Sequence, residues 1–326
     1  MNPVGITLGD PAGIGPELVA RALARSWSAP LRVFGDARLL QRAAATCGVV
    51  LPTFDLVEVT DLDAVAPDSL ETGTAQVAYL DAALREAKAG ALSALCTAPI
   101  HKAACKRAGF AFPGHTELLA ARLAPGATPL PVTMMLAGPR LRVSLATVHI
   151  ALAEVPLVLT AEAIHRAIVQ TVEALRGAFG IAAPRVAVCG LNPHAGEQGH
   201  FGDEEARLVV PAIERARAEF AGVQIDGPAV PDAVFRDAVD GKYDAVVALY
   251  HDQGLIPVKL VDFEEAVNVT LGLPLLRTSP DHGVAYDIAG KGIARPTSFF
   301  AALQMACEAS RAPKRAIPSG VIRSSP

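Results

Sequence analysis

The sequence predicts an α/β fold with largely parallel strands, divided into two domains. Short apolar runs alternate with amphipathic helical patterns along most of the chain, which is typical of strand–helix–strand units. The chain has 326 residues and 51% of them are hydrophobic, enough to bury a large core and more than one domain usually holds. Neither an internal repeat nor a low-complexity linker interrupts this pattern.

Six apolar runs are expected to be strands. They are "VGITLGD" (4–10), "LRVFGD" (31–36), "ALSALCTAP" (91–99), "LRVSLATVH" (141–149), "RVAVCGLNPH" (185–194) and "DAVVALYHDQ" (244–253). The segment 160–180 between two of them predicts a helix, because Thr160 can cap it and apolar residues recur at helical spacing from Ile164 to Leu175. The basic segment from residue 311 to 326 is expected to be a solvated tail.

The first strand leads into a glycine-rich turn and a helix. In "ITLGDPAGIGPELVARAL" (6–23), Pro16 suits a first helical turn and Glu17 lies near the positive helix end. Gly9, Gly13 and Gly15 would allow close backbone approach to a ligand. Their spacing fits neither GxGxxG nor GxxxxGK[ST], so a tight structural turn explains them equally well.

Composition excludes several classes of protein. The formal net charge is −4, so no general basic field invites nucleic acid. No apolar run is long enough for a membrane span, and the first ten residues do not have the pattern of a signal peptide. The 5 cysteines are scattered without a CxxC pair, which indicates reduced thiols in a cytoplasmic protein.

Three predicted strands end in histidine: His149, His194 and His251. The carboxyl ends of strands are where open α/β sheets bind ligands. Three imidazoles at one edge would hold a divalent metal and leave a position open for substrate, as in catalytic zinc sites. Each histidine could instead be a hydrogen-bonded loop residue, and spacing alone leaves both interpretations open.

Cations gather in one downstream stretch, where Lys259, Asn268 and Arg277 are separated by turn residues. Such a set can hold a phosphate or carboxylate, although ordinary surface charge is the alternative. A second polar group, His115 and Thr116 in "FPGHTELL", is wedged between hydrophobic flanks. Thr116 could also be a plain helix cap.

Seven motifs together resemble the 4-hydroxythreonine-4-phosphate dehydrogenase family of vitamin B6 biosynthesis. They are "GDPAGIGPE", "TAPIHK", "FPGHTE", "ATVHIAL", "GLNPHAGE", "YHDQGLIPVK" and "VNVTLGLPLLRTSPDHG", in consistent order from about residue 4 to 303. The resemblance implies a fold like that of isocitrate and isopropylmalate dehydrogenases, with two α/β/α domains. The first would comprise residues 1–128 plus about 285–326, and the second, residues 129–284, would carry the metal histidines and dimer contacts.

The resemblance also implies the roles of individual residues. The metal (zinc, cobalt or magnesium) falls on His149, His194 and His251, one of them supplied by the partner in a homodimer with a shared active site. Two acidic residues, Asp252 and Asp232, would assist the chemistry. The implied substrate contacts are His115, Thr116, Lys259, Asn268 and Arg277.

The activity implied is NAD-dependent oxidation of 4-(phosphooxy)-L-threonine at C3, with NADP a possible substitute. The metal would lower the pKa of the C3 hydroxyl, and decarboxylation would give 3-amino-1-hydroxyacetone phosphate. Two alternatives stay open: oxidation of a related phosphorylated acid (4-phospho-threonate or 4-phospho-erythronate), or a metal-dependent hydrolase. A third branch of relatives acts on cyclic dihydrodiols, and the retained "GHTE" speaks against it.

Overall fold

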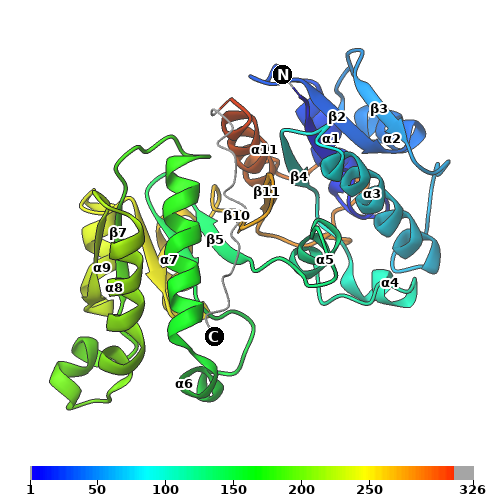
Figure 1. The fold of residues 1–326 in the computed structure, drawn as a ribbon. Helices are drawn as coiled ribbons and strands as arrows, with labels where there is room; N and C mark the ends of the chain where they lie inside the picture. Colours follow the sequence, from blue (N-terminus) through cyan, green and yellow to red (C-terminus); the bar gives the residue numbers. More distant parts are fainter. Residues whose placement is uncertain (1, 312–326) are drawn as a thin grey trace.

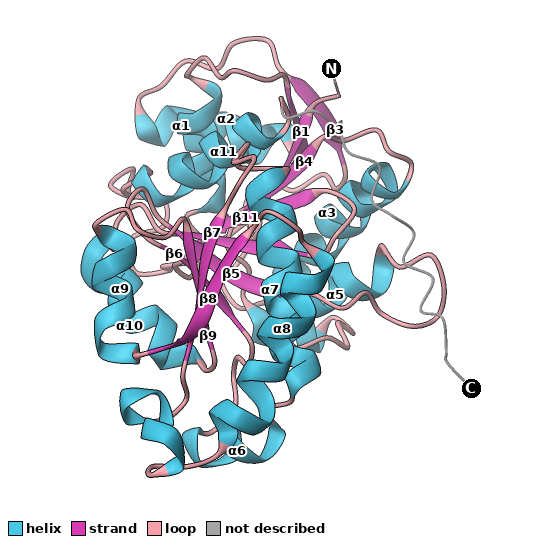
Figure 2. Cartoon of the chain, turned by 60° about the vertical axis from the view of Figure 1, so that its left-hand side comes forward, coloured by secondary structure: helices cyan, strands magenta, loops and turns pink. Residues whose placement is uncertain are grey.

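The structure, a computed structural model, describes residues 2–311, and these form one mixed sheet of 11 strands flanked by helices (Figures 1 and 2). The predicted α/β fold is therefore confirmed, while the expected tail lies outside the described residues except for Arg311. The strands are β1 (Val4–Thr7), β2 (Leu31–Gly35), β3 (Asp55–Glu58), β4 (Ala94–Thr97), β5 (Thr133–Ala137), β6 (Arg142–Leu145), β7 (Arg185–Cys189), β8 (Gln224–Ala229), β9 (Ala245–Ala248), β10 (Val267–Leu271) and β11 (Leu276–Pro280).

Helices of very different length cover the sheet. None of those in residues 2–311 combines the length and apolar character that a membrane span needs. The α-helices are α1 (Gly15–Leu23), α2 (Ala37–Cys47), α3 (Leu70–Lys88), α4 (Lys102–Arg107), α5 (His115–Arg122), α6 (Val155–Val158), α7 (Ala161–Arg176), α8 (Val210–Glu219), α9 (Pro231–Val239), α10 (His251–Asp262) and α11 (Thr297–Ala309), and the short turns are η1 (Leu152–Glu154), η2 (Pro193–Gly199) and η3 (Glu205–Val209).

The strand order is β3-β2-β1-β4-β11-β10-β5-β6-β9-β7-β8. Two blocks of this sheet are parallel. The first consists of β3, β2, β1, β4 and β11, and the second of β6, β9, β7 and β8. The antiparallel strands β10 and β5 join the two parallel blocks. Helices α1 to α3 surround the first block and α7 to α9 surround the second (Figure 1). The division into domains at residues 128 and 285 stays a prediction.

All six strands expected from the sequence are present, as β1, β2, β4, β6, β7 and β9. The other five strands were not anticipated. Strands β10 and β11 form a hairpin within the stretch that holds Asn268 and Arg277, and their polar residues hid the strand pattern. In the structure Arg277 bonds to Thr270 and Thr97, and Thr278 donates to the Ala302 carbonyl of α11, so these polar side chains have partners inside the protein.

Helix α7 shows why the local sequence predictions succeed. The Thr160 hydroxyl accepts a hydrogen bond from the amide of Ala163 at 3.1 Å, as an N-cap should. The predicted apolar stripe is buried in the main core cluster, with Ile164, Ile168 and Val172 fully inaccessible.

The glycine-rich turn after β1 packs backbone against backbone. A Cβ on Gly15 would lie 2.1 Å from the carbonyl oxygen of Leu8, and one on Gly9, at φ +66°, would lie 2.2 Å from that of Pro99. Both positions therefore require glycine for close packing. This supports the structural interpretation of the turn, with Pro16 in the first turn of α1 as expected.

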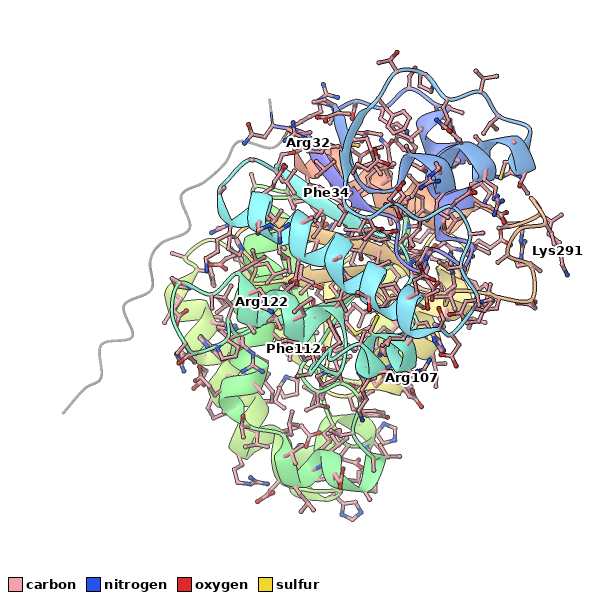
Figure 3. All side chains as sticks on the ribbon, turned by 90° about the vertical axis from the view of Figure 1, so that its right-hand side faces the viewer. Arg32, Phe34, Arg107, Phe112, Arg122 and Lys291 are labelled. Carbon is pink, nitrogen blue, oxygen red and sulfur yellow. The ribbon has the colours of Figure 1, made fainter. Side chains whose placement is uncertain are left out.

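A second core cluster fixes helix α5 on the side of the molecule that faces the viewer in Figure 3. Phe34 of β2 packs there with Leu80 of α3 and Leu118 of α5, while Phe112 covers the cluster from the loop before α5. On the same side, Arg107 of α4 forms an ion pair with Asp68. The position of α5 matters because it begins with His115.

Candidate active site

His149 and His251 are brought together by the neighbouring strands β6 and β9. Beyond the ends of these parallel strands, the Ala146 amide donates to the Ala248 carbonyl at 2.9 Å and the Thr147 hydroxyl donates to the Leu249 carbonyl at 2.7 Å. The two segments therefore stay in register past the sheet, and the rings of His149 and His251 lie 5.5 Å apart, centroid to centroid. This confirms that two strand-end histidines share one edge of the sheet.

The backbone around His251 is held by Gln253. Its side-chain oxygen accepts from the Leu249 amide at 2.7 Å and its amide nitrogen donates to the Gly190 carbonyl at 2.8 Å, which ties the end of β9 to the end of β7. The His251 Nδ1 lies 2.7 Å from Asp252 Oδ1. An aspartate bonded to one ring nitrogen orients the other for ligation, as in carboxylate–histidine–metal arrangements.

The pKa of His149 is lowered by its burial, then by the charges of His251 and Lys102. A lowered pKa keeps the imidazole neutral at pH 7, and neutral imidazole is the form that binds a metal. His149 and His251 therefore suit two positions of a metal site.

His194 is held in a separate loop shaped by Glu205. One carboxylate oxygen of this buried glutamate accepts from the amides of Leu191 and Asn192, both at 2.8 Å, and the other accepts from the Asn192 side chain at 3.1 Å. The His194 ring lies 6.1 Å from that of Phe201. Within residues 2–311 no group of three His, Cys, Asp or Glu side chains is close enough to hold a metal, so His194 does not join the other two in the same chain.

The loop that carries His194 has a strained backbone. All five residues from 194 to 198 have positive φ, and only one of them, Gly196, is glycine. Left-handed conformations cost non-glycine residues of the order of 1 kcal/mol each, and runs of them are rare. Such strain persists where surrounding contacts impose it, here those of Glu205, and it is typical of functional loops.

Arg277 is a buried cation that forms no ion pair with any acidic side chain of residues 2–311, although the charge of Glu117 acts on it through space. Its side chain comes from β11 and is 3% exposed. It donates to the hydroxyls of Thr97 at 2.8 Å and Thr270 at 3.3 Å, and to Nδ1 of His115 at 3.0 Å. Burial lowers the pKa of Arg277 to about 10, so the guanidinium remains charged at pH 7. An arginine enclosed by hydroxyls and an imidazole is prepared for an anion that arrives with a ligand.

The contact with Arg277 fixes the tautomer of His115. Because arginine can only donate, His115 Nδ1 must accept and its proton must be on Nε2. That Nε2 is buried, and no residue of the described range 2–311 forms a hydrogen bond with it. Burial, Arg277 and Lys102 all lower the pKa of His115, so it stays neutral. A buried unpaired N–H beside a cation is a second donor available to a bound anion.

Asn268 and Thr116 extend this group. Asn268 lies two residues from Thr270, which pairs with Arg277 in the β10–β11 hairpin, so these side chains share one face of the sheet. The Asn268 Oδ1 is buried without a partner. Thr116 is the second residue of α5, whose N-cap is Gly114, so the alternative that Thr116 caps the helix is wrong.

Lys259 and Asp232 lie apart from this group. Lys259 is an exposed residue of α10, and its ammonium forms an ion pair with Asp281 at 3.0 Å. Asp232 is exposed in the first turn of α9, a helix that packs near η2 and therefore near His194.

Lys102 and Glu117 lie near two groups of the site. One is the pair His149 and His251, and the other is the candidate anion-binding group around Arg277 and His115. Their side chains both lie beside Gly114, where an added Cβ would be 3.6 Å from Lys102 Nζ and 3.4 Å from Glu117 Oε2. The charge of Lys102 acts on both His115 and His149, and that of Glu117 acts on His149. The start of α4 and the start of α5 therefore lie within electrostatic reach of the histidine pair.

Comparison with known proteins agrees with this combination of metal-ligating and anion-binding groups. The family model of the pyridoxal phosphate biosynthetic protein PdxA matches residues 26–306. A 4-hydroxythreonine-4-phosphate dehydrogenase from Desulfosudis oleivorans is 49% identical over 334 aligned positions, covering 94% of this chain and 97% of the relative. The chain belongs to the PdxA family.

Solved structures of the PdxA family share the fold described above. A 4-hydroxythreonine-4-phosphate dehydrogenase from Klebsiella pneumoniae is 38% identical, with a TM-score of 0.84 over 95% of this chain and 100% of that one. A β-decarboxylating dehydrogenase from Thermococcus kodakarensis, 18% identical with a TM-score of 0.50 over 94% of this chain and 82% of that one, shows a likeness of fold alone. The expected dehydrogenase-like architecture is thus confirmed.

Sequence reasoning about this PdxA family member missed three residues that the structure singles out. Lys102 ends the motif "TAPIHK", which was used only to establish the resemblance. Thr97 begins the same motif and accepts from Arg277. Glu205 shapes the loop of His194 from the next helical segment. Lys102 and Thr97 could have been found by a simple signal, which is a polar residue inside an apolar run or shortly after it.

Proposed function

We propose that the chain is an NAD-dependent, metal-requiring dehydrogenase that oxidises 4-(phosphooxy)-L-threonine at C3 and decarboxylates the product to 3-amino-1-hydroxyacetone phosphate. Membership of the PdxA family supports a dehydrogenase of pyridoxal phosphate biosynthesis. The single observation that carries the substrate assignment is the buried Arg277. Within residues 2–311 it forms no ion pair, and it bonds to His115, whose Nε2 has no hydrogen-bond partner there.

The substrate phosphate is proposed to bind between Arg277 and His115. A guanidinium and a neutral imidazole N–H can both donate to phosphate oxygens, and both are already held in place by surrounding contacts. The start of α5 adds the Thr116 hydroxyl and the positive end of the helix dipole. Asn268 and Lys102 would add polar contacts around the substrate. Lys259 is proposed as a further contact, which would require its ammonium to leave Asp281.

A divalent metal (zinc, cobalt or magnesium) is proposed to bind His149 and His251 together with His194 of a second copy. The residues fit this role, because the first two rings adjoin, His149 is held neutral and Asp252 orients His251. When bound, the metal would supply Lewis acidity that favours loss of the hydroxyl proton and stabilises charge during decarboxylation.

The residues of the chain would then hold the substrate while hydride leaves C3 for NAD. Phosphate binding remote from C3 supplies energy that orients the reacting carbon. As C3 loses its hydride, the hydroxyl proton must be removed, and Asp252 and Asp232 are the proposed proton-handling groups. Carbon dioxide next leaves from the 3-oxo acid, and a proton is returned to C2.

A homodimer with a shared site is supported by exposed apolar side chains next to the candidate ligands. Helix α10, which begins at His251, presents Ile256 (66% exposed) and Leu260 (84%), followed by Phe263 (71%). The segment after His149 exposes Leu152, Leu157 and Val158. Apolar surface of this kind marks an interface. A second copy that covers it would bring its own His194 loop to the histidine pair.

The proposed function is tested with purified protein, NAD or NADP, and each metal in turn. NADH formation at 340 nm with 4-(phosphooxy)-L-threonine is expected, and chelation should abolish it until a divalent ion is returned. A higher kcat/KM for 4-phospho-threonate or 4-phospho-erythronate would reassign the substrate. Cleavage of a substrate without any NADH would instead identify a hydrolase.

Single replacement of His149, His194 or His251 by Ala tests the metal site independently of turnover. Each variant is expected to lose bound metal, measured by elemental analysis after dialysis, and to lose activity while keeping the wild-type circular dichroism spectrum. His200→Ala is the matched control, because His200 lies in the same loop as His194 and was not assigned to the metal. Full metal content in any of the three variants would remove that histidine from the site.

A further inference from the structure

A cavity of about 330 Å³ lies at the opposite edge of the sheet from the three histidines. Strands β6, β9 and β7 are parallel neighbours, so their first residues lie along one edge. The cavity is lined there by Arg142 and Arg185, which begin β6 and β7, and by Asp244, which precedes β9. At about 3.3 Å of rise per residue, the strands separate this edge from the histidine edge by roughly 10 Å or more.

Positive charge dominates the polar lining. Arg140, Arg142 and Arg185 line the cavity, against the single acid Asp244. Asp244 is fully engaged by Arg185, whose Nε and Nη2 donate to its two carboxylate oxygens at 3.1 and 2.9 Å. Nearby Asp262 is engaged as well, because one of its oxygens accepts from the amides of Arg140 and Leu141 at 3.1 and 3.0 Å.

Two acidic residues, one in α9 and one directly after it, already form ion pairs. Asp237 binds Lys242 at 2.8 Å, and Asp240 lies 3.6 Å from Arg236. Asp244 and Asp262 attract Arg142 through space, but among residues 2–311 neither Arg140 nor Arg142 forms an ion pair with a carboxylate.

Arg142 has unused donors in a partly desolvated position. Within the described part of the chain, its Nε is buried without a hydrogen-bond partner, and the side chain makes one hydrogen bond, a long contact of 3.3 Å from Nη1 to the Asp244 carbonyl. The guanidinium carbon lies 5.1 Å from the centre of the Phe179 ring, which holds the group in place. Burial lowers the pKa of Arg142. A cation in this setting gains when an anion completes its hydrogen bonds.

Arg140 lies at the rim of the cavity. Its side chain is exposed and makes no hydrogen bond or ion pair with any residue between 2 and 311. It is therefore free to close over a bound anion. The remaining wall is apolar and is formed by Leu141, Ala238, Val239 and Ala245, with the Tyr243 ring.

We infer that this cavity binds a small organic phosphate, as a second anion site separate from the candidate active site. The forks of Arg140 and Arg142 would donate to the phosphate oxygens, and the apolar wall would contact the organic part. The volume, about ten times the share of one water molecule in the liquid, exceeds what a bare phosphate ion fills. The inference does not depend on the proposed reaction, because no residue of the candidate active site takes part.

Calorimetric titration of the full-length protein with phenyl phosphate and with inorganic phosphate tests the site. Wild type should show a binding event that the double variant Arg140→Gln/Arg142→Gln lacks, while binding at Arg277 persists in both. Phenyl phosphate should bind this site at least about tenfold more tightly than inorganic phosphate, because it also buries its ring. Equal affinity for the two probes would overturn the assignment to an organic phosphate.

Arg140→Gln alone guards against misfolding, since that side chain makes no hydrogen bond or ion pair with residues 2–311. It should weaken binding of phenyl phosphate about threefold or more while leaving kcat/KM unchanged. Arg122→Gln, the same change on an exposed arginine of α5, is the control and should leave binding unaltered. Unchanged stoichiometry and affinity in both the single and the double variant would overturn the inference.

Discussion

At the scale of single residues, the most informative feature is an ionisable group whose usual partner is missing. Arg277 is 3% exposed, yet hydroxyls and a neutral histidine surround it. Burying an unpaired charge is costly, and the proposed substrate phosphate would offset that cost. The same reasoning applies to His115 beside Arg277, because its buried Nε2 is a donor that the proposed phosphate would satisfy.

Arg277→Ala should lower kcat/KM for 4-(phosphooxy)-L-threonine by roughly 2–4 kcal/mol of transition-state stabilisation, as expected for a lost charge-assisted contact. With 4-hydroxy-L-threonine, which has no phosphate, the loss should be small, because that compound never makes the contact. Steady-state kinetics on both substrates separate the two cases, with thermal unfolding to verify the fold. An equal loss on both substrates would mean that Arg277 is structural.

The cysteines provide a pH-dependent prediction. Burial raises the pKa of Cys96 and Cys105 to about 12 and that of Cys307 to about 11, and it raises the pKa of Cys189 further still. Cys47 is half-buried, and its pKa also lies above the ordinary thiol value, mainly through burial.

A thiol-specific reagent should therefore modify one cysteine per native chain, Cys47, and all 5 cysteines after unfolding in denaturant. Because only the thiolate reacts and pH 7–8 lies well below the raised pKa of Cys47, the rate should rise about tenfold between pH 7 and pH 8. Cys47→Ser should abolish the native reaction. Rapid modification of a second thiol would show that one of the buried sites opens readily.

At the scale of elements, the loop from Gly190 to His200 is shaped by a residue outside it. Glu205 accepts three hydrogen bonds from Leu191 and Asn192 and thereby fixes the entry to the left-handed segment that carries His194. Without those contacts, the five residues with positive φ would relax toward ordinary conformations.

Glu205→Gln should leave one of the buried amides poorly satisfied, and it should cost about 1–3 kcal/mol in the free energy of unfolding. It should also weaken metal binding, because His194 would lose its fixed position. Glu214→Gln, the same change at an exposed position of α8, should affect neither. Urea unfolding and metal titration measure the two effects, and unchanged metal affinity in Glu205→Gln would show that the loop does not depend on this anchor.

At the scale of the whole molecule, one chain brings together His149 and His251 and keeps His194 elsewhere. Helix α10 begins at His251 and exposes the apolar Ile256 and Leu260, and Phe263 follows directly after it. A complete three-histidine site therefore requires a second chain in the proposed arrangement, and the assignment of ligands to chains can be tested by mixing variants.

Mixed dimers of inactive His149→Ala and inactive His194→Ala chains should contain one intact site of the two. After complete subunit exchange, about a quarter of wild-type activity is expected, since half of the dimers are mixed and each has one working site. A mixture of His149→Ala with His251→Ala should stay inactive, because both ligands come from the same chain. Recovery in the second mixture, or none in the first, would contradict this division of ligands.

The sequence by itself determined the parts of this protein that local patterns encode. Alternating apolar runs and helical stripes specified six of the strands and helix α7, because burial of one face follows directly from residue spacing. Motif order specified the PdxA family, and with it the candidate roles of the histidines and of Arg277.

Only the tertiary structure decided which of those residues meet. Sequence could not show that His149 adjoins His251 while His194 lies apart, because that follows from the order β6-β9-β7 and from the loop held by Glu205. Nor could it show that Arg277 forms no ion pair within residues 2–311 whereas Lys259 pairs with Asp281. Such pairings depend on strand order and on contacts between residues far apart in the chain, which residue spacing does not encode.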